Sequence, residues 1–221
     1  ATDGISAATT VQNFTLTFTP QGSTTFDGTG DGLVTASSST LNLGTSDFTL
    51  EWWVYPDNFS KNANMVVDRR LGSSGEDVVI YLANTGAVVF YANSGVRITS
   101  ASTISASAWT HISLVRSSGT TKLYINGTAE SSTYSDSNNY TGSYVTLAKF
   151  YNGDAFELDG KISNYREVKG TAVYTSNFTP PTSPLSAITN TILLTCQNNT
   201  GTITDASSNN FTITAVGNAA A

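Results

Sequence analysis

The stretch of residues 109–127, WTHISLVRSSGTTKLYING, constrains the fold more than any other part of this chain. Ile112 and Leu114 alternate with polar or smaller neighbours, and so do Leu123 and Ile125, so each run predicts a strand that buries one face. The residues between the two runs, Ser-Ser-Gly-Thr at 117–120, have turn chemistry, and Asn-Gly at 126–127 favours the two positive φ angles of a type I′ turn. The stretch therefore predicts consecutive antiparallel strands joined by tight turns.

Short alternating segments of this kind recur along nearly the whole chain, separated by turns rich in Gly and Asn. No window shows a sustained helical period. This pattern predicts an all-β fold in which two antiparallel sheets pack as a sandwich, rather than a parallel α/β fold. The predicted strands are residues 11–18, 33–36, 48–55, 64–68, 77–82, 87–91, 96–99, 110–116, 122–125, 144–149, 160–168, 192–196 and 211–215.

The length indicates one domain covering residues 1–221. A chain of 221 residues can bury a full core, and all-β sandwiches of this size are commonly single domains. Residues 179–184, TPPTSP, form the one proline cluster and are expected to be extended loop. The strands that follow it, within about 192–215, are expected to lie beside the segment at about 11–18 and so to close the sandwich.

Composition excludes several classes of protein. Charged residues are 12% and hydrophobic residues 39%, which argues against disorder. The net charge of −6 argues against nucleic acid or an anionic membrane as partner, because both need a basic surface. No long apolar run and no signal-peptide pattern are visible. Cys196 and His111 are the only cysteine and histidine, so an internal disulfide and a Cys/His zinc site are excluded.

Several blocks carry a family resemblance that covers roughly residues 24–180. Besides the hairpin at 109–127, these blocks are TFDGTGDGL at 25–33, FTLEWWVYP at 48–56 and DGKISNYREV at 159–168. Together they resemble laminin G-like domains, which are jelly rolls of the concanavalin A-like class. The segments at 170–181, 193–197 and 205–214 resemble modules in structural proteins of marine tailed bacteriophages. The resemblance implies a two-sheet jelly roll, but it leaves the ligand open, because lectins, glycanases and adhesion modules share this fold.

Catalysis is the first function to weigh, because the resemblance includes glycanases. Retaining enzymes of that class carry a Glu-X-Asp-X-Glu strand whose acids share one face. Glu157-Leu-Asp-Gly begins in this way, but Lys161 stands where the third acid belongs, so the acid that protonates the leaving group is missing. We interpret residues 157–161 as an exposed acidic turn and His111 as a neutral imidazole on a strand face. The sequence predicts a protein that is not an enzyme.

Calcium is the cofactor that the resemblance implies. Many related jelly rolls hold one Ca²⁺ through carboxylates and loop carbonyls, the oxygen ligands that this ion prefers. Asp27 and Asp31 flank a Gly-rich turn, and Asp159 or Glu157 is expected to approach from a late strand. The alternative is that Asp-Gly and Gly-Asp serve only as turn formers.

Alternation in residues 48–55 separates two faces of one strand. Phe48, Leu50, Trp52 and Val54 suit the core, which leaves Glu51, Trp53 and Tyr55 on the other face. The strands at 77–82 and 87–91 place Tyr81 and Tyr91 on their second faces in the same way.

If these strands are neighbours, Trp53, Tyr55, Tyr81 and Tyr91 make one concave aromatic surface. Such a surface suits sugar stacking, with Glu51, Arg69 and Arg70 as hydrogen-bonding groups at its rim. The alternative is that loops cover this face and turn it into a second, minor core.

The expected function is therefore non-catalytic recognition. The resemblance implies an adhesion or decoration module of a phage virion, located on the virion surface or otherwise extracellular, that binds glycan or polysaccharide on a host cell. The alternative is a structural module that contacts other virion proteins and binds no sugar. A homo-oligomer is a further expected feature, because display in several copies amplifies weak binding.

Overall fold

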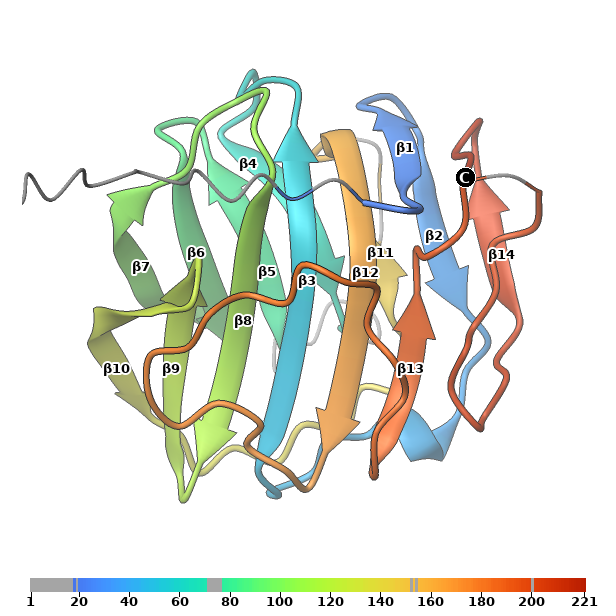
Figure 1. Ribbon diagram of the computed structural model, residues 1–221. Helices are drawn as coiled ribbons and strands as arrows, with labels where there is room; N and C mark the ends of the chain where they lie inside the picture. Colours follow the sequence, from blue (N-terminus) through green and yellow to red (C-terminus); the bar gives the residue numbers. More distant parts are fainter. Residues whose placement is uncertain (1–17, 19, 71–76, 152, 154, 200) are drawn as a thin grey trace, which may run out of the picture.

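The computed structural model describes residues 18, 20–70, 77–151, 153, 155–199 and 201–221. Two antiparallel sheets pack face to face, which confirms the predicted all-β sandwich (Figure 1). The first sheet has the order β1-β12-β3-β8-β9-β10, with β13 also paired to β12. Its strands are β1 (Thr24–Asp27), β3 (Phe48–Pro56), β8 (Thr110–Ser117), β9 (Thr120–Ile125), β10 (Thr128–Ser135), β12 (Asp159–Lys169) and β13 (Thr191–Thr195).

The second sheet has the order β14-β2-β11-β4-β5-β6-β7. Its strands are β2 (Gly32–Thr35), β4 (Ala63–Asp68), β5 (Val79–Ala83), β6 (Ala87–Ala92), β7 (Gly95–Thr103), β11 (Thr146–Leu147) and β14 (Ile213–Val216). A single turn of 3₁₀ helix, Ser39–Leu41, follows β2. In the described part of the chain, no helix has the length and apolarity needed to cross a bilayer.

The predicted hairpin is confirmed as β8 and β9. Ser118 and Gly119 turn the chain with φ angles of 50° and 74°, and Asn126 and Gly127 make the next turn with 48° and 76°. The strand after that turn, β10, was not predicted. Its sequence, TAESSTYS, is largely exposed at the edge of the first sheet, so it lacks the alternation that marks a buried face.

The core lies between the two sheets, and the predicted faces of β3 are correct. Phe48, Leu50, Trp52 and Val54 are fully buried. They belong to the same hydrophobic cluster as the inward side chains of the second sheet, among them Ile80, Leu82, Val88 and Phe90. Alternation along β3 therefore leaves Thr49, Glu51, Trp53 and Tyr55 on the outer face of the first sheet.

The two last strands lie in different sheets. β13 pairs with β12 in the first sheet, and β14 pairs with β2 in the second. Both lie at the same end of the sandwich (Figure 1). Of the expected partner segment 11–18, all but Phe18 lies outside the described residues, and Phe18 itself is not in a strand.

A bulge in β12 decides which of its side chains face outward. The register against β3 shifts between Ser163 and Arg166, and Asn164 has a positive φ of 53°. As a result Arg166 lies opposite Glu51 on the outer face, whereas Glu167 lies opposite the core residue Leu50.

Residues 170–190, which we call the strap, join β12 to β13 by crossing the outer face of the first sheet (Figure 1). Thr49 on β3 donates a hydrogen bond to the carbonyl of Thr171 at 3.0 Å and accepts one from the N–H of Val173 at 2.8 Å. At the far side, the N–H of Phe178 donates to the carbonyl of Gly127 at 2.9 Å. The strap is thus bound to the sheet at both ends of its crossing.

Candidate ligand-binding cleft

A cleft of about 670 Å³ lies on the outer face of the first sheet, between the strap and the upper part of β3 and β8. We call it the aromatic cleft. Its lining combines aromatic rings with small polar side chains: Phe18, Trp53, Tyr55, Ser107, Ala108, Trp109, Asn126, Thr179, Pro180 and Thr182.

Two half-buried rings form the open part of the aromatic cleft. Tyr55 on β3 and Trp109, which immediately precedes β8, have ring centroids 5.5 Å apart and planes inclined by 57°. Lys161 on β12 lies over the Tyr55 ring, with Nζ 4.7 Å from its centroid, and pairs with Asp57 at 3.6 Å. The charges at this end of the cleft are therefore balanced.

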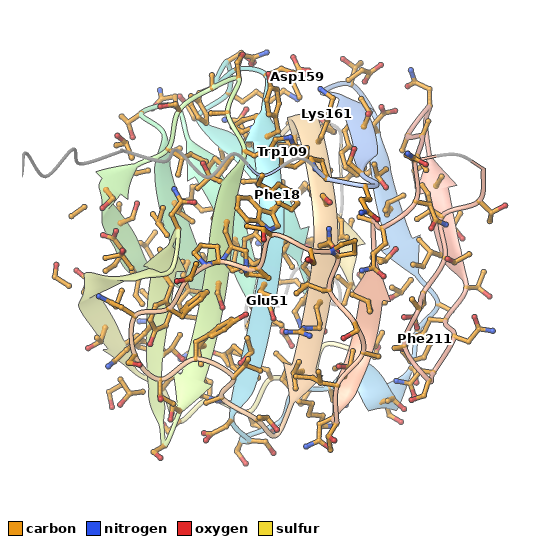
Figure 2. The ribbon with its side chains drawn as sticks, viewed as in Figure 1. Phe18, Glu51, Trp109, Asp159, Lys161 and Phe211 are labelled. Atoms are coloured by element: carbon orange, nitrogen blue, oxygen red, sulfur yellow. The ribbon has the colours of Figure 1, made fainter. Side chains whose placement is uncertain are left out.

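Trp53 is covered instead of exposed. The Phe18 ring stacks on it, with centroids 3.8 Å apart and planes within 5° of parallel, and only 6% of Trp53 is accessible. Trp109 and Phe18 meet edge to face at 5.7 Å, and Figure 2 shows the Trp109 label just above the Phe18 label, over the first sheet. The hypothesis that Trp53 is a freely exposed stacking ring is therefore wrong in its geometry.

Glu51 lies under the strap and not at the rim of a site. Its carboxylate accepts hydrogen bonds from Arg166 at 2.9 and 2.5 Å and from the Tyr174 hydroxyl at 2.8 Å, and His111 Nε2 lies 3.3 Å away. Burial alone would raise the pKa of Glu51, but hydrogen bonding to His111 and the charge of Arg166 outweigh it, so the pKa lies below its ordinary value. The carboxylate anchors the strap through Tyr174.

Aromatic packing completes this covered region. The Tyr174 and Phe178 rings of the strap stack with centroids 3.6 Å apart, and Phe178 also packs against His111 at 5.7 Å and Tyr124 at 5.6 Å. His111 lies on a strand face as the sequence predicted, opposite Trp53, and is fully buried there. Over this part of the sheet, the predicted alternative of a second, minor core is correct.

Tyr81 and Tyr91 do not share a surface with Trp53 and Tyr55. They lie on β5 and β6 of the second sheet, whereas β3 belongs to the first, so the two pairs face away from each other across the sandwich. The predicted single aromatic surface is wrong, because alternation shows which residues share a face of one strand but not which strands are neighbours. The residues divide between two outer faces.

Arg69 is also misplaced by the sequence prediction. It is fully buried, and its Nη1 donates to both carboxylate oxygens of Glu167 on β12, at 2.6 and 2.5 Å. Nη2 donates to the carbonyl of Leu41, and Asp77 lies 3.5 Å from Nε. Arg69 therefore joins the end of β4 in one sheet to β12 in the other and is not available to a ligand.

The carboxylates predicted to bind calcium already have other partners. Asp31 accepts from the N–H groups of Asp27 at 2.9 Å and Asn218 at 2.8 Å, and Asp159 accepts from Asn58 at 2.5 Å. Among the described residues, no group of three or more His, Cys, Asp or Glu side chains is arranged to hold a metal ion.

Lys61 supplies a cation at the place where calcium was expected. Its ammonium donates to the carbonyls of Gly28 at 2.6 Å and Glu157 at 3.1 Å, and to the Glu157 carboxylate at 2.9 Å. A calcium ion would need these same carbonyl and carboxylate oxygens as ligands. Because the Lys61 ammonium already binds them, the side chains as placed do not fit a calcium ion. Calcium binding in solution stays a prediction.

The Glu157-Leu-Asp stretch is not the exposed turn that was expected. Glu157 is fully buried in its ion pair with Lys61, and the strand begins at Asp159 instead of Gly160. Asp159 and Lys161 both lie near the top of β12 in Figure 2. Among the described residues, the lining of the aromatic cleft contains no carboxylate that would serve as acid or nucleophile.

Several cleft residues were not predicted as functional. Trp109 was recognised only as the start of a strand, and Asn126 only as a turn former. Thr179, Pro180 and Thr182 come from the strap, whose path over the sheet leaves no periodic signal. A tryptophan placed just outside a buried strand was the one local sign available.

Comparisons with known proteins agree with this architecture. Residues 27–180 match the family model described as the concanavalin A-like lectin/glucanases superfamily, as the laminin G-like resemblance predicted. A search of curated proteins found no match.

Three solved structures share the fold. A candidate carbohydrate-binding protein from Bacteroides ovatus superposes with a TM-score of 0.62 at 15% identity, over 89% of this chain and 59% of that one. The sialidase of Trypanosoma rangeli with bound sialic acid gives 0.56 at 12%, over 71% of this chain and 26% of the sialidase. Domain 4 of the arabinanase AbnA from Geobacillus stearothermophilus, in complex with arabinotriose, gives 0.51 at 15%, over 68% and 72%. This chain thus spans about three fifths of the Bacteroides protein and a quarter of the sialidase.

Proposed function

Because this chain belongs to the concanavalin A-like lectin/glucanase superfamily, we propose that it is a non-catalytic carbohydrate-binding module whose aromatic cleft receives glycan. The observation that carries the proposal is the pair of half-buried rings, Tyr55 and Trp109, in a cleft of about 670 Å³. Sugar rings present flat C–H faces that pack on aromatic rings, while their hydroxyls need polar partners at the edge.

Polar side chains surround these rings on several sides. Ser107 comes from the connection between β7 and β8, Asn126 from the turn between β9 and β10, and Thr179 and Thr182 from the strap. Hydroxyl and amide groups both donate and accept hydrogen bonds, as sugar hydroxyls do. Since no carboxylate lines the described part of the cleft, binding and not glycoside hydrolysis is the function it supports.

The size and charge of the cleft favour an uncharged oligosaccharide. A volume of about 670 Å³ lies within the range of small-molecule sites and exceeds what one sugar ring fills. The cation over Tyr55, Lys161, is paired with Asp57, and the whole chain carries −6. The solved arabinanase domain holds arabinotriose, so neutral oligosaccharides of this length are the first ligands to try.

The test is a glycan array followed by titration of the best neutral oligosaccharide. Replacing Trp109 with Ala is expected to weaken binding about tenfold or more, which corresponds to the roughly 1.4 kcal/mol or more that a buried aromatic contact contributes. Tyr134→Ala is the matched control, because Tyr134 is a half-buried tyrosine on β10 outside the cleft. A folded wild-type protein that binds no glycan on the array would reject the proposal.

We further propose that the module acts outside the cell, as an adhesion or decoration module on a phage virion. The support is the resemblance of residues 193–197 and 205–214 to modules of phage structural proteins. Immunogold labelling of phage particles with an antibody against this protein tests the location.

The alternative, an assembly module that contacts other virion proteins, needs an apolar contact surface. Among the described residues only Val96 and Ile188 are large hydrophobic side chains with high exposure, and they lie on β7 and on the strap. Two isolated side chains do not make such a surface. Capture of virion proteins without any glycan binding would favour the alternative.

A further inference from the structure

A second hollow lies on the opposite face of the sandwich, on the outer side of the second sheet. It has a volume of about 290 Å³, and we call it the second-sheet hollow. Its lining residues are Ala63, Met65, Arg70, Val79, Tyr81, Tyr91, Phe150 and Phe156. It contains Tyr81 and Tyr91, the two residues of the predicted aromatic surface that do not line the aromatic cleft.

Aromatic rings dominate this hollow. Tyr81 and Tyr91 extend from the neighbouring strands β5 and β6, and both are only half-buried. Phe150 and Phe156 meet edge to face at 5.6 Å, and Met65 and Val79, both buried, complete the lining. The hollow thus offers the combination of flat rings and phenolic hydroxyls that suits a ligand with one apolar face and a polar edge.

Arg70 holds the rings in place and leaves the hollow electrically neutral. Its guanidinium lies 4.7 Å from the Phe150 centroid and 6.0 Å from that of Tyr91. The same guanidinium donates to the Asp68 carboxylate through Nε at 2.9 Å and Nη2 at 2.6 Å. Because this bidentate pair balances the charge, the hollow does not favour a carboxylate-bearing ligand.

We propose that the second-sheet hollow is a second carbohydrate site, which holds one ring of a neutral sugar. The volume of about 290 Å³ lies at the lower limit for small-molecule sites, less than half that of the aromatic cleft, so it suits a single ring or chain end. A tyrosine hydroxyl is protonated at neutral pH and donates a hydrogen bond, and burial raises the pKa of Tyr81 further above its ordinary value. The inference rests on the proposed function only for the class of ligand.

Two sites on opposite outer faces make the module bivalent. Each sheet carries one site, and the hydrophobic core lies between them. One ligand ring cannot contact both sites, so the protein is expected to bind two sugars independently and to link two polysaccharide chains.

The chain provides a separate spectroscopic reporter for each site. Met65, the only methionine, lines the second-sheet hollow, so protein labelled with ¹³C-methyl methionine gives one methyl signal from that site. The indole N–H signal of Trp109 reports on the aromatic cleft. Both signals are followed while glucose, galactose, mannose, arabinose, N-acetylglucosamine and arabinotriose are titrated, with glucuronic acid and N-acetylneuraminic acid as acidic comparisons.

A saturable shift of the Met65 signal with at least one neutral sugar is the expected result. Trp109→Ala should leave this shift intact, whereas Tyr91→Ala should weaken it at least tenfold. Tyr81→Ala serves as an independent second variant, with circular dichroism checking the fold of each. Tyr134→Ala is again the control, because Arg97 lies over its ring at 5.1 Å as Arg70 lies over Tyr91.

The outcomes separate the two sites. Saturation at Trp109 with no shift at Met65 would overturn the second site and leave the aromatic cleft as proposed. A shift at Met65 alone would support the second site and reject the cleft. No shift at either reporter would reject both, and stronger shifts with the acidic sugars would overturn the assignment to neutral ligands.

Discussion

At the scale of single residues, Glu51 anchors the strap, and the stability that it contributes depends on pH. Its pKa is lowered in the folded protein relative to 4.5, so its contribution to stability is complete above pH 4.5 and is lost as the pH falls through the folded pKa. Glu51→Gln leaves Arg166 without its counter-charge and should lower the free energy of unfolding by about 3 kcal/mol near neutral pH. Denaturant titrations should show this difference narrowing below pH 4.5.

The matched control for Glu51 is Asp57→Asn. Asp57 pairs with Lys161 at the surface, where both side chains are more than a third exposed and solvent screens the interaction. It should change the free energy of unfolding by at most about 0.5 kcal/mol. If the free energies of unfolding of the wild type and Glu51→Gln differ by the same amount from pH 6 to pH 3, the titration of Glu51 does not contribute to the pH dependence of stability.

Lys61 is the second residue with a testable role, as an internal cation. Lys61→Ala removes the donor of the Gly28 and Glu157 carbonyls and one of the cations beside the buried Glu157 carboxylate, which then keeps Lys149 at 3.8 Å. The melting temperature should fall, and calcium should recover part of the loss, because the freed oxygens are calcium ligands. The wild type should melt at the same temperature in calcium and in EDTA. A wild type that EDTA destabilises would support the calcium prediction. Lys161→Ala, which removes the exposed pair with Asp57 and the contact with the Tyr55 ring, is the control.

At the scale of elements, the strap depends on one glycine in the turn after β9. A Cβ on Gly127 would lie 1.9 Å from the Phe178 carbonyl oxygen, and the φ of Gly127 is +76°. Gly30 has almost the same φ, +73°, but nothing lies within 4 Å of its Cβ position. Gly30→Ala should therefore cost only the backbone strain of about 1–2 kcal/mol.

Gly127→Ala should cost more than about 4 kcal/mol or release the strap from the sheet, because backbone atoms cannot move aside as a side chain can. Thermal melting and limited proteolysis within residues 170–190 measure the two consequences. If Gly127→Ala and Gly30→Ala change the melting temperature and the rate of proteolysis equally, the strap makes no restrictive steric contact with this turn.

The elements also show what the sequence can and cannot predict. The bounds of the strands at 48–55 and 110–116 were predicted to within one residue, because the two faces of a half-buried strand produce alternating apolar and polar side chains along the sequence. The separation of Tyr81 from Trp53 was not found, because the order of strands in a sheet is set by long-range pairing. Pairing also explains why Glu51 and Arg69 were expected at a rim: burial by the strap and by Glu167 depends on residues more than 90 positions away.

At the scale of the whole molecule, the aromatic cleft and the second-sheet hollow differ in size and lie on opposite outer faces, and the ion pair between Arg69 and Glu167 connects the two sheets between them. The module therefore consists of a single core that supports two surfaces. Substitutions on one face should leave binding at the other unchanged, since sites with no shared partners behave additively.

The position of β12 also determines when this chain is able to fold. β12 lies between β3 on one side and β1 and β13 on the other, yet more than a hundred residues separate it from β3. During synthesis, one edge of β3 therefore remains unpaired until residues 159–169 have emerged, and an unpaired apolar edge invites association with other chains. A force-profile measurement on arrested nascent chains should show no folding before this strand leaves the ribosome. Slow, late folding is the cost of a sheet in which β12 pairs with a strand more than a hundred residues before it.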